Sequence, residues 1–232
     1  ESKAFYEIEL AILKYKREDK INEKSKTTFI EHLTKAYLQM KKIEPIVNLL
    51  IKHNVQHLEE LYIKFSNTKQ SLLYTAARNN SAAVIRALHQ AGYNVANDSG
   101  YKIFQRDGHT LHQTVSTLYI AAQKNAAVAI RALASVGYDF ANDSGYKIFQ
   151  RDGQTLQKTD SSLYIAADQN SANAIKALAS VGYNVANDSG WQLFQHDGQT
   201  LQKTASSLYI AAEKNAADVI RALASVGYGI AN

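Results

Sequence analysis

The first seventy residues carry apolar side chains at the spacing of amphipathic helices. Apolar residues recur every three or four positions, which gathers them along one side of a helix. One stripe begins beside Pro45, a residue suited to the first turn of a helix. We therefore expect residues 1–70 to form a helical capping segment with four helices. The stripes are Phe5, Ile8, Ile12 and Tyr15; Phe29, Leu33, Tyr37 and Met40; Val47, Leu50 and Ile51; and Leu58, Leu61, Tyr62 and Phe65.

After residue 70 the chain repeats itself every 45 residues. Each copy begins with a variant of Ser-x-Leu-Tyr-Ile-Ala-Ala and continues through Ala-Leu to Gly-Tyr. Apolar residues at i, i+3 and i+4 predict two short helices in this part. In the second copy, Ser116 is placed to cap the first helix, Asn125 to end it, and Gly137 to end the second helix. The copies are 71–115, 116–160, 161–205 and 206–232.

The second half of each complete copy predicts a β-hairpin. Two runs of β-forming residues flank Asp107-Gly108, a dipeptide typical of tight hairpin turns. A two-residue turn places Phe104 opposite Leu111 on one face, with Tyr101 on the other face. A three-residue turn with a bulge shifts the register by one residue and exchanges the faces. The sequence leaves both turns open.

The helical half of the copies resembles the ankyrin repeat. The Thr-Pro-Leu-His-x-Ala-Ala opening of that family is matched by residues 116–122, which read Ser-Thr-Leu-Tyr-Ile-Ala-Ala. The family's Leu-Leu-x-x-Gly-Ala-Asp-Val-Asn close is matched by residues 132–140. The resemblance covers residues 71–232 and implies a helical solenoid that binds partner proteins. The copies depart from the family in the histidine of the opening, which is tyrosine in every copy, and in their longer period.

The additional residues of each copy fall where ankyrin repeats have a finger, normally a short β-turn. Stacked helices lie about 8–10 Å apart, and a two-stranded hairpin is about 9.6 Å wide. Because the two lengths agree, we expect the fingers 98–115, 143–160 and 188–205 to merge into one six-stranded sheet. The expected fold class is mainly α with β-hairpins: an ankyrin-like helical solenoid whose fingers are extended into antiparallel hairpins.

Composition removes several classes of protein. Apolar residues make up 46% of the chain and charged residues 20%, which is typical of a globular protein. No apolar stretch is long enough to span a membrane, and the chain has no cysteine for disulfides or thiolate chemistry. The expected location is the cytoplasm, or the host cytoplasm for a secreted bacterial effector. The net charge of +5 is spread along the chain apart from a basic run at 14–26, which makes nucleic-acid binding a less favoured function.

No arrangement of residues indicates catalysis. Asp98 and Asp107 recur in three copies, which is typical of turn-forming residues and not of a single active site. No cysteine and no group of carboxylates completes a metal-ligand set with His109 and His112, and these histidines become glutamines in the next copy. The glycines form neither a phosphate-binding loop nor a dinucleotide fingerprint. We therefore expect no enzyme activity, cofactor, metal or small-molecule substrate.

Contact with a partner protein is expected from two groups of residues. The first group contains aromatic and basic side chains of the hairpins, because Tyr, Trp and Arg are frequent in interface hot spots. The second contains charged residues near the ends of the first helices, which differ from copy to copy. The hairpin candidates are Tyr101, Phe104, Arg106, Tyr146, Phe149, Arg151, Trp191, Phe194 and His196, and the helix candidates are Arg78, Lys124, Asp168 and Glu213.

These observations favour a scaffold that binds a protein partner and has no chemistry of its own. Self-assembly into a homo-oligomer is an alternative, because the outer strands of a sheet recruit other strands. A second alternative is that the chain is the targeting portion of a larger protein, for example a bacterial effector. Nucleic-acid binding is a third.

Overall fold

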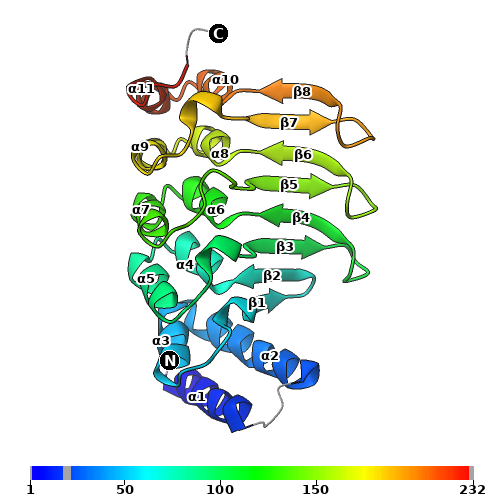
Figure 1. Ribbon diagram of the computed structural model, residues 1–232, viewed down its shortest axis with the longest axis vertical. Coiled ribbons are helices and arrows are strands. Elements are labelled where there is room, and N and C mark those ends of the chain that lie inside the picture. The colour runs from blue at the N-terminus through cyan, green and yellow to red at the C-terminus, as the bar shows by residue number, and fades with distance from the viewer. Residues whose placement is uncertain (1, 18–21, 230–232) are drawn as a thin grey trace.

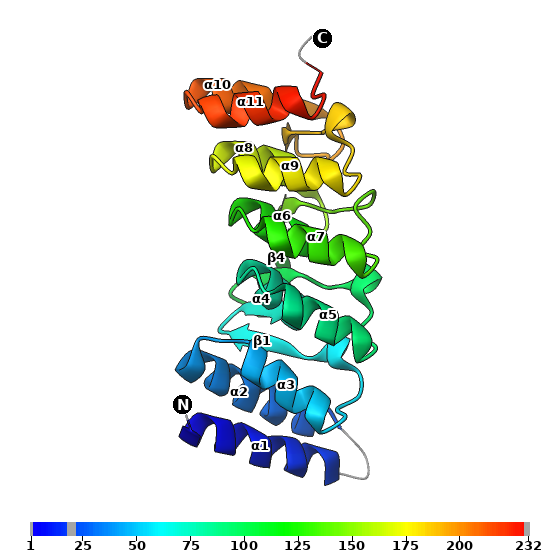
Figure 2. The same ribbon diagram turned by 90° about the vertical axis from the view of Figure 1, so that its left-hand side faces the viewer.

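The computed structural model describes residues 2–17 and 22–229. From residue 72 onward, helices stack along one side of the molecule and strands along the other, in the order of the chain, and the first two helices lie beyond the first strand of the sheet (Figure 1). A view turned by 90° shows successive helix pairs lying one above another (Figure 2). None of the described helices combines the length and apolar character needed to cross a membrane. The expected combination of helices with antiparallel strands is confirmed.

Three helices form the N-terminal end of the molecule. They pack through the predicted apolar stripes, whose central members, such as Ile12 and Leu33, are fully buried. The Ser25 amide donates a hydrogen bond of 2.9 Å to the carboxamide oxygen of Asn22, which satisfies one of the free donors at the start of the second helix. The helices are α1 (Ser2–Arg17), α2 (Glu23–Met40) and α3 (Glu44–Lys52).

The prediction of a fourth helix in this segment is wrong. The residues form a 3₁₀ turn, η1 (Leu58–Glu60), and then a hairpin of β1 (Tyr62–Phe65) and β2 (Thr68–Ser71). A short apolar run at helical spacing does not distinguish a helix from a strand, and Tyr, Ile and Phe favour strands. His57 and Ser66 adopt left-handed backbone conformations, with φ of 55° and 47°, and so interrupt a helix on both sides.

Each 45-residue copy begins with two short helices. The predicted caps are confirmed: the Tyr119 amide donates to Ser116 Oγ at 3.0 Å, and the other copies make the same bond. Asn125 follows the first helix with φ of 53°, and Gly137 follows the second with φ of 81°. The helix pairs are α4 (Leu72–Arg78) and α5 (Ala82–Gln90), α6 (Thr117–Gln123) and α7 (Ala127–Ser135), α8 (Ser162–Asp168) and α9 (Ala172–Ser180), and α10 (Ser207–Glu213) and α11 (Ala217–Ser225). The 3₁₀ turns η2 (Val95–Asn97) and η3 (Val185–Asn187) follow two of the pairs.

One antiparallel sheet contains the eight strands of the described residues, in the order β1 to β8. The sequence predicts six of them, and the hairpin of the N-terminal segment supplies the other two. Strands of neighbouring copies pair with one another, for example through Val115 and Tyr146. The strands of the copies are β3 (Tyr101–Phe104), β4 (Leu111–Val115), β5 (Tyr146–Phe149), β6 (Leu156–Asp160), β7 (Trp191–Phe194) and β8 (Leu201–Ala205).

The pairing of Phe104 with Leu111 predicted for the two-residue turn is confirmed, but the loop is longer than in either version considered. The Gln105 amide donates to the Thr110 carbonyl at 2.7 Å, so that residues 106–109 form the loop. Phe104 pairs with Leu111, and a bulge next to this pair shifts the remaining register by one residue. The Asp107 carboxylate accepts hydrogen bonds from two following amides, which stabilises this longer turn.

A repeated aspartate joins each copy to the next. Asp143 accepts hydrogen bonds from Tyr138 Oη at 3.0 Å and from Ser162 Oγ of the next copy at 2.7 Å. Asp98 and Asp188 bind the equivalent tyrosine and hydroxyl groups. The residue predicted to form a turn therefore also connects neighbouring copies.

Glycine is required where each hairpin begins. Gly145 has φ of 58°, and a Cβ atom there would lie 2.3 Å from the carbonyl oxygen of Asp160. The carbonyl of Gly145 accepts a hydrogen bond of 2.8 Å from the Ser116 amide, at the start of the first helix of the same copy. This close approach of backbones fixes the start of the hairpin relative to the helix pair of its own copy.

Candidate protein-binding surface

Alternation of side chains along the strands gives the sheet two faces of different character. On one face, the ring of Tyr101 stacks on Tyr74 of α4 with centroids 5.4 Å apart. Tyr146 stacks on Tyr119 of α6 in the same way, at 5.6 Å. This face therefore turns toward the first helix of each pair. We call it the helix-side face, and by the alternation along β3, β5 and β7 it comprises Tyr101, Ile103, Tyr146, Ile148 and Trp191.

A lysine occupies the space between two rings of the helix-side face. The ammonium group of Lys158 lies 5.5 Å from the ring centroid of Tyr146 and 5.8 Å from that of Trp191. It also lies 3.3 Å from a carboxylate oxygen of Asp160. Cation–π contacts stabilise by roughly 0.5–1 kcal/mol at exposed sites. Lys158 thus stabilises the two rings and reduces the apolar area that they offer to a partner.

The opposite face of the sheet carries a groove close to the hairpin turns. Phe104, Phe149 and Phe194, one from each hairpin, line it, and all three are half-buried. Its volume is about 1200 Å³. We call this feature the outer groove. Arg106, Arg151, His112 and His196 also line it, whereas no carboxylate is among its lining residues in the described chain.

Glutamine side chains fix the distance between neighbouring hairpin turns. Gln105 Nε2 donates to the carbonyl oxygen of Arg151 at 3.2 Å, and Gln150 Nε2 donates to that of His196 at 3.1 Å. His196 Nδ1 also lies 3.2 Å from Gln150 Oε1. The lining of the outer groove is therefore held at the spacing of the strands.

The structure divides the hairpin candidates between the two faces. As the alternation along a strand predicts, Tyr101 and Phe104 are three residues apart on one strand and point in opposite directions. A single flat partner does not contact both sets. The helix-side set is Tyr101, Tyr146 and Trp191, and the outer-groove set is Phe104, Arg106, Phe149, Arg151, Phe194 and His196.

The candidates on the first helices differ in their availability to a partner. Arg78, Lys124 and Glu213 are exposed. Asp168 is half-buried and forms an ion pair of 2.8 Å with Lys214 of the next copy. A partner that binds Asp168 therefore competes with a contact inside the chain.

Two residues of the helix side were missed by the sequence analysis. Asp160 is buried, and its Oδ1 atom has no hydrogen-bond partner within the described chain. Burial raises the pKa of Asp160, although Lys158 acts in the opposite direction. The sequence did contain one signal for Asp160: the equivalent residue of the preceding copy is Val115, so a carboxylate replaces an apolar side chain at this position. Tyr209 of α10 is 60% exposed, and no pattern in the sequence distinguishes it from the other tyrosines of its position.

The two aspartates that recur in the copies lie in opposite environments. Burial raises the pKa of Asp143 at the junction between copies. At the hairpin turn, hydrogen bonds from the Thr110 hydroxyl and then from backbone amides lower the pKa of Asp107 to about 2. Both roles are structural, as the repetition predicts. Within residues 2–17 and 22–229, no cluster of three His, Asp or Glu side chains has the arrangement of a metal site.

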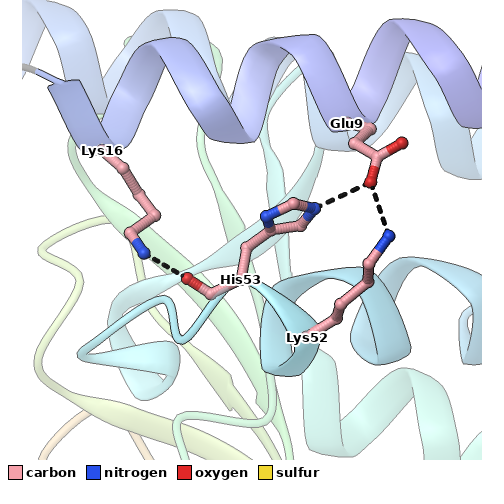
Figure 3. Close-up of polar contacts among 4 residues, drawn as sticks. All are labelled: Glu9, Lys16, Lys52 and His53. Atoms are coloured by element: carbon pink, nitrogen blue, oxygen red, sulfur yellow. Dashed lines mark hydrogen bonds and ion pairs between the residues drawn. The ribbon is translucent and has the colours of Figure 1, made fainter.

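A polar cluster in the N-terminal segment fastens α1 to α3 (Figure 3). Glu9 Oε1 accepts a hydrogen bond of 2.9 Å from Lys52 Nζ and lies 2.8 Å from His53 Nε2. The ammonium group of Lys16 donates to the carbonyl oxygen of His53. The contact with Lys52, followed by that with His53, lowers the pKa of Glu9. The cluster is accounted for by the packing of the helices.

The basic run at 14–26 is partly neutralised by contacts within the chain. Lys26 forms an ion pair with Glu60, and Lys16 is held by a backbone carbonyl. Glu18, Asp19 and Lys20 of this run lie outside the described residues. The described part of the run therefore offers fewer unpaired cations than its composition indicates.

Helix pairs that follow one another along an antiparallel sheet define the chain as a repeat protein. No family model and no curated protein sequence matches it. Among solved structures, the crystal structure of the human ASB11 ankyrin repeat domain is similar, with a TM-score of 0.51 over 85% of this chain and 69% of that chain, at 15% identity. The chain thus has the ankyrin repeat fold, and the resemblance inferred from the opening and closing motifs is confirmed.

Proposed function

We propose that this chain is a scaffold for protein–protein recognition, in which the helix pairs form an ankyrin-like solenoid and the hairpins are lengthened fingers. The observation that carries the proposal is the row of partly exposed aromatic and basic side chains on three consecutive hairpins. Such side chains are enriched in the hot spots of interfaces. The ankyrin repeat fold supports the same conclusion.

Affinity capture with two altered chains tests the proposal. One chain carries Phe149→Ser and Arg151→Gln in the outer groove, and the other carries Trp191→Ala and Tyr209→Ala on the helix side. We expect a specific partner to be lost with one pair of changes and retained with the other, while circular dichroism shows that both chains are folded. A set of captured proteins that is identical for the intact and both altered chains would overturn the proposal.

Self-assembly is a second candidate function, favoured by the outer edge of β8. This strand is last in the sheet, and its residues are exposed except for the half-buried Ala205. An open edge offers backbone donors and acceptors to another strand, and a second copy supplies one through antiparallel β8–β8 pairing. Light scattering should then show dimers at high concentration, which Thr204→Asp weakens by placing a carboxylate on each of the two paired strands. A monomer at all concentrations removes this candidate.

A further inference from the structure

The outer groove has a fixed period. Neighbouring strands of a sheet lie about 4.7–4.9 Å apart, and each copy contributes two strands, so equivalent residues recur about every 9.6 Å. Pairing between copies is uninterrupted from β3 to β8. The glutamine contacts with Arg151 and His196 keep the same spacing at the turns. Phe104, Phe149 and Phe194 therefore form a row of rings with a repeat of about 9.6 Å.

One regular backbone conformation has a turn of this length. A polyproline II helix has three residues per turn and rises about 3.1 Å per residue, which gives about 9.3 Å per turn. An α-helix turns every 5.4 Å or so. A β-strand returns to the same face about every 6.7 Å. A polyproline II segment that crosses the strands would thus present every third side chain to one phenylalanine in each of three hairpins.

The side chains that line the groove indicate which residue types such a segment contains. Aromatic-lined grooves bind proline-rich polyproline II segments in several recognition domains. The basic side chains of Arg106, Arg151 and His196 recur with the rings, and Lys69 lies with its ammonium 5.2 Å from the ring centroid of Phe104. Since no carboxylate lines the groove in the described chain, its charge complements an acidic residue in each turn of the ligand.

We propose that the outer groove binds a proline-rich segment of a partner protein in the polyproline II conformation, with an acidic residue at every third position. This inference rests on the proposed scaffold function and names the class of partner for one of its two faces. The turns also carry Asp107, Asp152 and Asp197, whose side chains accept hydrogen bonds in their ionised form. These negative charges repel a ligand that is charged along its whole length, such as a nucleic acid, more strongly than a segment with one carboxylate per turn.

Fluorescence anisotropy with a labelled (Pro-Pro-Glu)₄ peptide tests the inference. The matched peptide has the same composition, but its glutamates are separated by two and four positions in alternation. We expect the periodic peptide to bind the intact chain at least tenfold more tightly than the permuted peptide. Phe149→Ala should weaken binding of the periodic peptide about tenfold, because it removes the central ring.

The charge contribution is tested by Arg151→Gln, since the contact of Arg151 with Gln105 uses the backbone carbonyl and survives this change. Arg131→Gln, on the exposed side of α7, removes the same charge elsewhere and should leave the affinity unchanged. Equal affinity for the two peptides, or insensitivity to Phe149→Ala and Arg151→Gln, would overturn the inference. Tighter binding of oligo(dT) than of either peptide would overturn it in favour of single-stranded nucleic acid. Partner capture that depends only on Trp191 and Tyr209 would remove this inference and leave the scaffold function intact.

Discussion

The two edges of the sheet are treated differently by the rest of the molecule. At the first edge, α2 packs against β1, and the Lys64 amide donates a hydrogen bond of 2.9 Å to Thr34 Oγ1. Phe65 makes an edge contact with Tyr37, whose ring centroid lies 6.4 Å away. At the other edge, β8 has no strand or helix of the described chain along its outer side, and Leu201 is 48% exposed.

This difference shows that the N-terminal segment both packs helices against the first copy and forms the first edge of the sheet. Its helix α3 packs against α5, its helix α2 packs against β1, and its hairpin supplies the first two strands of the sheet. Covering an edge with a helix is one of the ways in which proteins prevent unwanted strand pairing. The hairpin of the last strands resembles the earlier hairpins, but no helix of the described chain covers β8. The sheet can therefore be extended at β8.

The largest expected effect compares one residue from each edge. Ile63 of β1 is fully buried, so Ile63→Ala should reduce the free energy of unfolding by about 2–5 kcal/mol. Leu201 of β8 is exposed, and Leu201→Ala should change it by less than about 0.5 kcal/mol. Urea unfolding followed by circular dichroism measures both values. Similar losses for the two variants would show that the edges are equally covered in solution.

The second prediction compares hairpins at different distances from the covered edge. Gly108 and Gly153 have φ of 75° and 72°, so alanine strains both turns by about 1–2 kcal/mol. A Cβ atom at Gly108 meets nothing within 4 Å, whereas at Gly153 it would lie 3.1 Å from the Leu111 amide nitrogen of the preceding hairpin. Gly153→Ala should therefore lower the melting temperature more than Gly108→Ala.

Asparagine at the same position separates the backbone effect from packing. Asn adopts positive φ more readily than other non-glycine residues, so Gly108→Asn should be milder than Gly108→Val. Equal melting temperatures for these two variants would contradict the turn assignment. Equal losses for Gly108→Ala and Gly153→Ala would show instead that neighbouring turns do not touch.

Repetition made much of the fold predictable from the sequence. Ser116, Asn125 and Gly137 each have one local physical role, and recurrence in other copies strengthened each assignment. The N-terminal hairpin was missed because Leu58, Leu61 and Phe65 occur once and fit a helical stripe as well as they fit a strand. The strand conformation there depends on pairing with β3, a contact that the local pattern does not contain.

The candidate surface was predictable in its residue types and not in its arrangement. The sequence identified the aromatic rows, but the four-residue loop and the bulge come from hydrogen bonds of Asp107 that the Asp-Gly dipeptide does not specify alone. The outer groove depends on three copies held side by side by sheet pairing. Asp160 was missed because a single change between near-identical copies, from Val115 to Asp160, resembles ordinary sequence variation. Its burial is visible only in the structure.

The third prediction concerns the residue that directly precedes the opening serine of each copy. From the covered edge to the open edge of the sheet, this residue is Gln70, Val115, Asp160 and Ala205. Asp160 is buried with one oxygen unpaired, so Asp160→Val, which copies the preceding repeat, should stabilise the chain by about 1 kcal/mol at neutral pH. The reverse change Val115→Asp should destabilise it by about 2 kcal/mol. Calorimetry measures both. A loss of stability in Asp160→Val would show that the contacts of Asp160 with Lys158 outweigh its burial.

The smallest expected effect is found by comparing Asp143, which lies at the junction between two copies, with Asp107, which lies at an exposed hairpin turn. Burial raises the pKa of Asp143 above its ordinary value of 3.8, so the folded state binds its proton more tightly than the unfolded state. Its contribution to stability is therefore full below pH 3.8 and falls as pH rises through the raised pKa. Hydrogen bonds lower the pKa of Asp107 from 3.8 to about 2, so its contribution is present above pH 3.8 and falls between pH 4 and pH 2 or so.

These opposite signs are measured with Asp143→Asn and Asp107→Asn, because asparagine removes the titration and nearly preserves the shape. The melting temperature of Asp143→Asn relative to the natural chain should increase between pH 3 and pH 7. That of Asp107→Asn should be lowest at pH 7 and approach the natural chain toward pH 2. Carboxyl ¹³C shifts of the natural chain give the two pKa values directly, and an Asp143 that titrates below 3.8 would contradict the assignment. Because Asp143 holds neighbouring copies together and Asp107 holds one turn, only the first change should also alter hydrogen exchange in the adjoining copy.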